Sequence, residues 1–185
     1  MKNPKVASRY AQALFDYASE LNQIEAVKGE LQQIIQVLKE NQELQIVLNS
    51  PVIVPSKKYA IFSQIFSESI GDTTFNFLGV IIKKKREPAI AAICEEYLKL
   101  YNQAHNIKVA TLTTAQPLSE PLLTKIKGLL EEKTHATVQI KQLVDPEIIG
   151  GFLIKFDDNF IDTSVLSKIN RLKQEFAHNI YQVNY

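Results

Sequence analysis

The spacing of apolar residues changes once along this chain, and that change constrains the fold. Through the first hundred residues, apolar side chains return every three or four positions, as they do on one face of an α-helix. Residues 107–114 are instead rich in β-branched side chains, and residues 137–141 alternate as a strand does. The pattern predicts a mostly α chain with a small α+β part, divided into residues 1–105 and residues 106–185.

Proline and glycine divide the first part into six expected helices. Pro51 ends the third helix, because the residue before a proline is pushed out of the α region. Pro55 and Pro88 suit the first turns of the fourth and sixth helices, and Gly71 is the expected residue just after the fourth. A closing helix is expected to carry the apolar stripe Val165, Ile169, Leu172, Phe176 and Ile180.

Composition narrows the kinds of partner. The formal net charge is +1, which provides no general attraction for nucleic acid. The one basic run, residues 83–86, lies at the end of the expected fifth helix, where cations complement the helix dipole. No apolar run approaches the roughly 18 residues needed to cross a bilayer. We therefore expect neither a nucleic-acid partner nor direct insertion into a membrane.

No residue pattern predicts a cofactor or a metal. His105, His135 and His178 lie far apart, whereas metal ligands normally cluster in sequence, and a single cysteine excludes both an internal disulfide and a cysteine-based zinc site. Gly150 and Gly151 are not followed by the Lys-Ser or Lys-Thr of a phosphate loop. They are expected to form a bulge or a close backbone approach where a strand begins.

The densest acidic group is Asp157, Asp158 and Asp162. It lacks the spacing of an EF-hand. Asp157 and Asp158 suit a hairpin turn, because aspartate tolerates the left-handed conformation, and Asp162 or Ser164 suits the N-cap of the last helix. A small enzyme that uses these aspartates is one hypothesis, but the structural reading is favoured, and we expect a non-catalytic protein.

The expected fifth helix is apolar on more than one face. Its two stripes are Phe75, Leu78 and Ile82, and Phe77, Val80 and Ile81. Such a helix is either central and fully buried, or it turns its second face to a partner. Few helices can be surrounded on all sides in so small a bundle, and a stripe left in water forgoes about 1.5–3 kcal/mol for each large side chain. This favours a partner surface.

Two segments, residues 6–18 and the stretch within residues 144–164, together resemble the δ subunit of F-type ATP synthase, the counterpart of the mitochondrial oligomycin-sensitivity-conferring protein. Residues 6–18, VASRYAQALFDYA, resemble the first helix of that family. Residues 144–155, VDPEIIGGFLIK, and residues 161–164, IDTS, resemble its C-terminal signature. The resemblance covers nearly the whole chain, and one departure is that the chain contains no tryptophan, so no Trp can anchor an interface.

The resemblance implies a non-catalytic stator subunit without a cofactor. Residues 1–105 would form a six-helix bundle that binds the N-terminal helix of an α subunit on the catalytic head, in a groove between the first and fifth helices. Residues 106–185 would bind the b subunits of the peripheral stalk, so that proton translocation is coupled to ATP synthesis. The candidate partner-binding residues are Tyr10, Ala13, Leu14, Tyr17, Asn76, Phe77, Val80 and Ile81.

The expected location is the cytoplasmic face of a bacterial inner membrane, as a peripheral part of the complex. The start of the sequence lacks the Arg-rich, acidic-poor character of a mitochondrial leader. The alternative function is that of an unrelated helical adaptor or scaffold protein with an appended α+β module.

Overall fold

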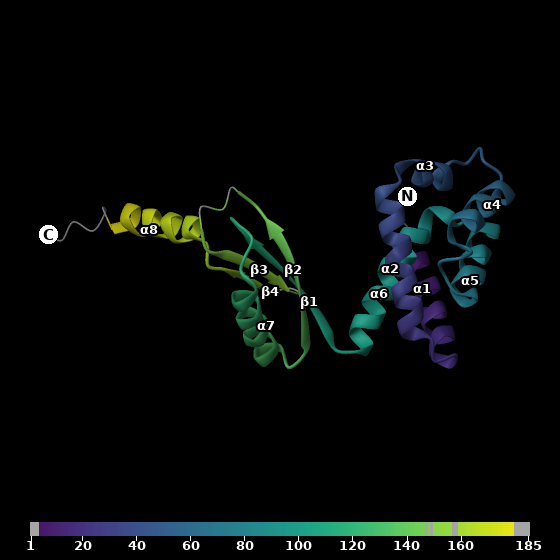
Figure 1. The fold of residues 1–185 in the computed structure, drawn as a ribbon. Coiled ribbons are helices and arrows are strands. Elements are labelled where there is room, and N and C mark those ends of the chain that lie inside the picture. The colour runs from purple at the N-terminus through teal and green to yellow at the C-terminus, as the bar shows by residue number, and fades with distance from the viewer. Residues whose placement is uncertain (1–3, 147, 149, 157–158, 180–185) are drawn as a thin grey trace. The chain divides into compact units, whose positions relative to one another are not determined.

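The computed structural model describes residues 4–146, 148, 150–156 and 159–179 of the 185-residue chain. The chain divides into two compact units, one ending at His105 and the other beginning at Asn106 (Figure 1). The described residues are mostly helical and include one four-stranded sheet, which confirms the expected mostly α chain with a small α+β part. The expected turn at Asp157 and Asp158, and Ile180 of the closing stripe, lie outside the described residues.

The described residues of the first unit form six α-helices and one short 3-10 helix. They are α1 (Pro4–Glu20), α2 (Ile24–Glu40), α3 (Gln42–Asn49), α4 (Pro55–Phe66), α5 (Asp72–Lys83), η1 (Glu87–Ala89) and α6 (Ile90–Ala104). Pro55 lies in the first turn of α4, as predicted, whereas Pro88 lies in the short 3-10 helix η1 that precedes α6 and not in α6 itself. The prediction for Gly71 was wrong. It precedes α5, since α4 already ends at Phe66, and its N–H donates to Glu30 of α2 at 2.9 Å.

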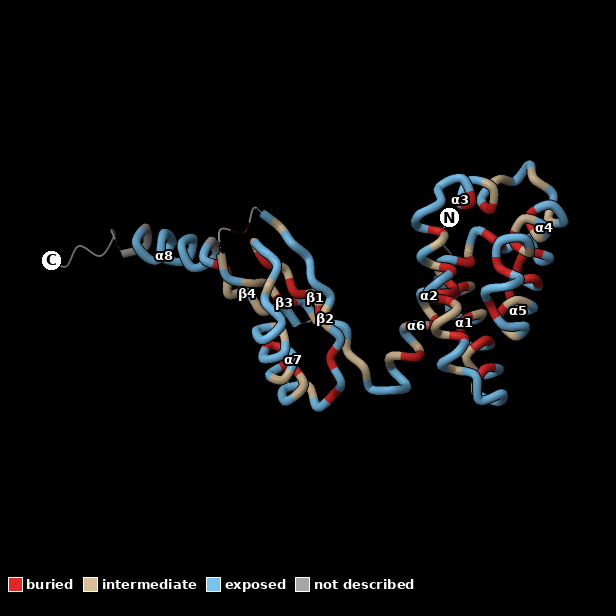
Figure 2. The backbone as a smooth tube through the Cα atoms, in the orientation of Figure 1, coloured by how far each residue is buried: buried red, intermediate tan, exposed pale blue. Residues whose placement is uncertain are grey.

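The core of the first unit is built on close packing of α1 and α2 against α6. The buried face of α1 is Ala7, Ala11, Leu14 and Ala18, spaced four, three and four residues apart. Its three alanines let α1 approach α6 closely. Tyr97 of α6 is fully buried, and its hydroxyl donates to the carbonyl of Ile24 at 3.2 Å. Figure 2 shows the buried positions recurring along the inner sides of these helices.

The chain's one cysteine, Cys94, is also in this core. It lies on the buried face of α6 and is fully buried. Burial raises the pKa of its thiol to about 12, because the thiolate would lose its hydration. The thiol is therefore neutral and shielded in the folded protein.

An ion pair is buried where α3, α4 and η1 meet. Lys58 of α4 is only 2% exposed, and its ammonium group donates to the carboxylate of Glu87 and, at 2.7 Å, to the carbonyl of Leu48. The second oxygen of Glu87, Oε2, is buried without a hydrogen-bond partner among the described residues. One buried lysine thus links three elements through a carbonyl and a carboxylate.

The described residues of the second unit form a sheet and two helices. Its elements are β1 (Ile107–Thr114), α7 (Glu120–Thr134), β2 (Thr137–Val144), β3 (Phe152–Phe156), β4 (Asn159–Asp162) and α8 (Val165–Asn179). The strand order is β2-β1-β3-β4, with β1 parallel to β2 and antiparallel to β3. Helix α7 makes the crossover between the parallel strands and covers one face of the sheet (Figure 1). The core is Ala110, Leu112, Ile126, Leu130, Val138 and Ile154.

The C-terminal signature, residues 144–155 and 161–164, includes parts of β3 and β4 and the connection from β4 to α8. Gly151 has φ +82, and a Cβ there would lie 2.5 Å from the carbonyl oxygen of Thr163, so the expected close backbone approach is confirmed. Asp162 accepts from the N–H of Ser164 at 2.8 Å and from the hydroxyl of Ser167. These bonds, chiefly from Ser167, lower the pKa of Asp162. The expected capping role is therefore confirmed, since Ser164 also accepts from the N–H of Ser167 at 3.2 Å.

Candidate helix-binding groove

Helices α1 and α5 meet through an aromatic pair. The rings of Tyr10 and Phe77 are 6.4 Å apart between centroids and lie edge to face, at an interplanar angle of 72°. This is a favoured geometry for two aromatic rings. The contact brings together two residues that the sequence analysis chose from segments 67 positions apart (77 minus 10).

A pocket of about 320 Å³ lies beside this pair. It is lined by Val6, Arg9, Tyr10, Ala13 and Arg86. The guanidinium carbon of Arg86 is 5.9 Å from the centroid of the Tyr10 ring, close enough for a cation–π interaction. The lining therefore combines apolar surface with two positive charges.

The end of α5 fixes the position of Arg86. Lys85 has φ +56, and its N–H donates to the carbonyl of Ile82 at 2.9 Å. The N–H of Arg86 reaches back to the carbonyl of Ile81 at 3.0 Å. These two bonds are those of a Schellman motif, in which a left-handed residue ends the helix. The main chain at Arg86 is thus fixed by hydrogen bonds at the end of α5.

Six of the eight predicted partner-binding residues have accessible surface. Tyr10 and Phe77 are partly exposed, while Ala13, Tyr17, Asn76 and Val80 are exposed. Tyr17 and Val80 are each 48% exposed. We use the name α1–α5 groove for the candidate partner surface that comprises these six side chains and the adjoining pocket, which Arg9 and Arg86 also line.

The other two predicted residues, Leu14 and Ile81, are fully buried in this structure, so they offer no accessible surface to a partner here. Leu14 continues the buried alanine face of α1. Ile81 lies on the buried face of α5 together with Leu78 and Ile82. Neighbouring apolar positions on a helix differ by only about 100° in direction, so the sequence did not show which stripe faced inward.

Arg9 and Arg86 line the pocket but were missed as site residues. Arg86 belongs to the basic run that was attributed to the dipole of α5. Arg9 directly precedes Tyr10 on the first helix. Their shared location depends on tertiary packing, so the available signal was only that each adjoins an element chosen as a partner surface.

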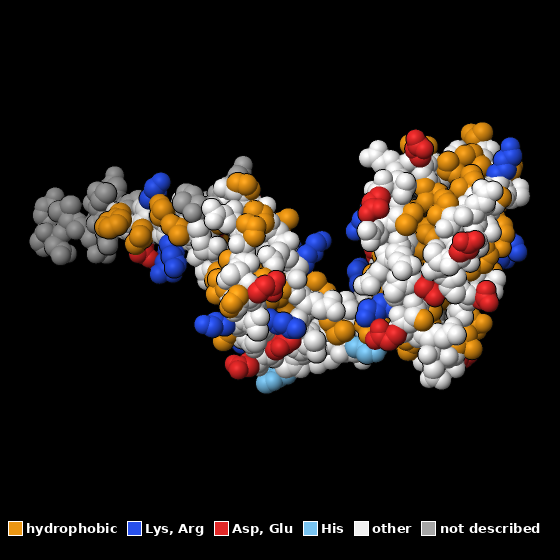
Figure 3. All heavy atoms as spheres, in the orientation of Figure 1, with side chains coloured by type: hydrophobic (Ala, Val, Ile, Leu, Met, Phe, Trp, Pro, Cys, Tyr) orange, Lys and Arg blue, Asp and Glu red, His pale blue; other side chains and the backbone are white. Residues whose placement is uncertain are grey.

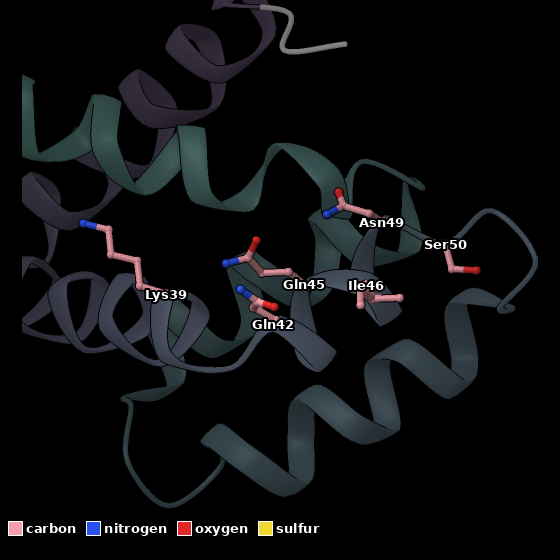
Figure 4. A pocket seen from close by; sticks show the side chains of 6 residues that line it. All are labelled: Lys39, Gln42, Gln45, Ile46, Asn49 and Ser50. Carbon is pink, nitrogen blue, oxygen red and sulfur yellow. The ribbon is translucent and has the colours of Figure 1, made fainter.

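Another pocket, of about 520 Å³, runs along α3 and is lined by Lys39, Gln42, Gln45, Ile46, Asn49 and Ser50. Figure 4 shows these side chains spread from Lys39 in α2, along α3, to Ser50 just beyond it, rather than converging on one point. Five of the six side chains are polar, and of these five only Lys39 is charged. This arrangement does not orient a reacting group, so we do not assign it as a site.

Two of the histidines, His105 and His135, lie where a structural role accounts for them. The His105 ring stacks on Tyr101 with centroids 4.1 Å apart, and His135 ends α7 in the left-handed conformation. Within the described parts of the chain, no three histidine, cysteine or acidic side chains cluster as metal ligands would. None of the helices described there is both long and apolar enough to cross a membrane.

The fold defines a class of protein, a two-unit chain with a helical first unit and a second unit built on a four-stranded sheet. Comparison with known proteins identifies the family. The model of the ATP synthase delta (OSCP) subunit family matches residues 6–176. The ATP synthase subunit delta of Alkaliphilus metalliredigens is 37% identical over 175 residues, which cover 95% of this chain and 97% of that protein.

A second relative, the ATP synthase subunit delta of Cytophaga hutchinsonii, is 33% identical over all 185 residues and covers both chains fully. Among solved structures, a chain in the Toxoplasma gondii mitochondrial ATP synthase hexamer has the same fold. Its TM-score is 0.74 at 22% identity, over 92% of this chain and 97% of that chain.

The chain belongs to the ATP synthase delta (OSCP) subunit family. It is a non-catalytic peripheral-stalk subunit of F-type ATP synthase. This confirms the resemblance found in the sequence and excludes both the unrelated adaptor and the small enzyme.

Proposed function

We propose that the α1–α5 groove binds the N-terminal helix of the ATP synthase α subunit, and that the second unit binds the b subunits of the peripheral stalk. The subunit would then work at the cytoplasmic face of a bacterial inner membrane. It would hold the catalytic head still against the rotor, so that proton translocation is coupled to ATP synthesis. The observation that carries the proposal is the pairing of Tyr10 and Phe77 beside exposed apolar surface.

The side chains of the groove suit a helix. Ala13 is small, so another helix can approach the backbone of α1 closely at that point. Tyr10 and Tyr17 offer large rings together with hydroxyl groups that remain satisfied at a boundary with water. Val80 is 48% exposed in the absence of a partner, and covering it removes apolar surface from water at roughly 25 cal/mol per Å². Helix-in-groove recognition uses this kind of surface.

Helix α8 supports the proposal for the second unit. Among its described side chains, the exposed large apolar residues are Val165, Ile169, Leu172 and Phe176, spaced four, three and four residues apart. This is the spacing of a coiled-coil seam. Leu172 is 51% and Phe176 is 69% exposed, and Figure 3 shows hydrophobic side chains along this helix. A seam of this kind suits packing against the helix of another subunit.

The groove is tested by calorimetric titration with a synthetic peptide that spans about the first 20 residues of the α subunit from the same organism. Tyr10→Asp or Phe77→Asp should weaken binding at least tenfold, because each places a charge in an apolar contact. Gln32→Asp, on the exposed side of α2, is the matched control and should leave the affinity unchanged. Failure of the unaltered protein to bind the peptide would remove the groove assignment.

The stalk surface is tested by co-purification from membranes. The unaltered chain should bring down the α, β and b subunits. Phe176→Asp should lose b while it still binds the α peptide, because the two surfaces lie on different units. Exposed Arg171→Gln, on the same helix but outside the apolar seam, serves as the control. Normal recovery of b with Phe176→Asp would show that α8 is not the stalk surface.

A further inference from the structure

Two arginines reach the same pocket from different elements. Arg9 lies on α1 and Arg86 lies just beyond α5, and both line the pocket beside Tyr10. Both side chains are exposed. In the part of the chain that the structure describes, no ion pair involves either guanidinium. The pocket therefore holds two positive charges that no carboxylate of the described chain neutralises.

The carboxylate next in sequence to Arg86 is already engaged. Glu87 turns into the core, where it pairs with Lys58. The opposite directions of Arg86 and Glu87 keep the negative charge inside the bundle and the positive charge at the groove. The groove is consequently more basic than the formal charge of +1 for the whole chain would suggest.

Arg86 is also held in place before any partner arrives. The end of α5 fixes its backbone through the two bonds that Lys85 and Arg86 donate, and the Tyr10 ring lies beneath its guanidinium. A planar guanidinium can donate two parallel hydrogen bonds to one carboxylate, which an ammonium group cannot do. A guanidinium held in this way loses little freedom on binding.

We propose that the α1–α5 groove selects an amphipathic helix that carries an aspartate or glutamate, and that Arg9 and Arg86 bind this carboxylate. The inference depends on the proposed function of the groove and adds the charge pattern of the bound helix. Tyr10, Ala13 and Phe77 contact its apolar face. The two arginines set the register, because the carboxylate has to lie beside the Tyr10 end of the groove.

The test uses the full chain and the N-terminal α-subunit peptide from the same organism. Each aspartate and glutamate of the peptide is replaced singly by asparagine or glutamine. One replacement should weaken binding by about tenfold or more, the usual range for a lost hydrogen bond to a charged group. Arg86→Gln and Arg9→Gln should weaken binding of the original peptide similarly. A double-mutant cycle combines Arg86→Gln with the peptide replacement that weakens binding to the unaltered chain. That replacement should lower the affinity of the Arg86→Gln variant little further.

Lys84→Gln is the matched control, because Lys84 is an exposed cation of the same basic run that does not line the pocket. It should change the affinity less than twofold. Arg86→Lys keeps the positive charge but cannot donate two parallel hydrogen bonds to one carboxylate, so it should bind the peptide with intermediate affinity. Affinity for the original peptide should also fall less steeply between 50 and 300 mM salt, as rough working limits, for Arg86→Gln than for the unaltered chain.

The outcomes separate the two proposals. If the unaltered chain does not bind the peptide at all, the proposed function of the groove fails. If the peptide binds but every acidic replacement and both glutamine variants bind equally well, the groove stands and the charge inference is overturned. Circular dichroism checks the fold of each variant. Should Arg86→Gln unfold, the peptide replacements and Arg86→Lys still decide the question.

Discussion

At the scale of single residues, the tightest constraint in the second unit falls on Gly151. Its φ of +82 is one that side chains rarely adopt, and an added Cβ would meet the carbonyl oxygen of Thr163 at 2.5 Å. That carbonyl belongs to the connection between β4 and α8, whose Thr163 N–H donates to the carbonyl of Phe152 at 3.0 Å. A side chain at Gly151 would therefore force the start of β3 away from this connection.

Gly151→Ala should lower the free energy of unfolding of the second unit by at least about 1–3 kcal/mol, the cost of a strained backbone conformation. Gly128→Ala is the matched control. Gly128 lies inside α7, nothing lies within 4 Å of an added Cβ, and alanine there should raise stability by about 0.5–1 kcal/mol. Urea unfolding, followed through the amide NMR signals of the second unit, measures both. Equal stabilities for Gly151→Ala and the unaltered chain would contradict this account.

The residue types in the sequence predicted some structural roles correctly but did not decide others. Paired glycines before an apolar run indicated a close approach, because few other residues tolerate one. The inward face of α1 was harder to predict, since Leu14 belongs both to the predicted stripe with Tyr10 and Tyr17 and to the buried alanine face. The alanines identify the inward face of α1 only when α6 is known to pack closely against them.

At the scale of elements, Lys58 ties together three segments that hydrophobic packing alone would leave weakly oriented. It donates to the carbonyl of Leu48 at the end of α3 and to Glu87 in η1. The same η1 directly follows Arg86, which lines the groove. The buried pair therefore anchors the backbone next to the candidate binding surface.

Lys58→Met should lower the free energy of unfolding of the first unit by about 3–5 kcal/mol, because it leaves Glu87 as an unpaired buried charge. Lys58→Met combined with Glu87→Leu should recover most of that loss. Lys99→Met is the control. Its ion pair with Glu96 is exposed, so its loss should change stability by about 0.5 kcal/mol or less. Chemical denaturation of the three variants measures these differences, and a neutral Lys58→Met would disprove the role of the pair.

The types and order of the elements could largely be predicted, because apolar spacing and proline positions are local signals. The position of Gly71 could not, since the turn before α5 depends on a bond from its N–H to Glu30, 41 residues earlier. The buried face of α5 also depends on tertiary packing. Ile81 is buried and Val80 is exposed, and Gly79 lies against the Tyr59 ring of α4, where an added Cβ would come within 2.9 Å.

At the scale of the whole molecule, each unit has a hydrophobic core of its own. The first is helical, and the second is built on a sheet with α7 against one face. Their lengths, 105 and 80 residues (185 minus 105), fall within the usual range for domains that fold alone. This division also separates the two proposed partners, the α subunit and the b subunits.

Residues 1–105 and residues 106–185, expressed separately, should each fold and unfold cooperatively. The first fragment should bind the α-subunit peptide within about twofold of the full chain's affinity, because the groove lies entirely within that unit. The second fragment should not bind it. Circular dichroism and the calorimetric titration described above test both statements. An unfolded first fragment, or one without affinity for the peptide, would show that the units depend on each other.

Because Cys94 is buried, the rate at which its thiol reacts reports how often the protein opens locally. As the chain's one thiol, it becomes available to a labelling reagent only while α6 is separated from its neighbours, so the labelling rate measures how often the helical unit opens. Opening of the sheet unit leaves this signal unchanged. A helix seated in the groove would lengthen the interval between openings, and the strength of that attachment could then be measured as a time, without any engineered probe.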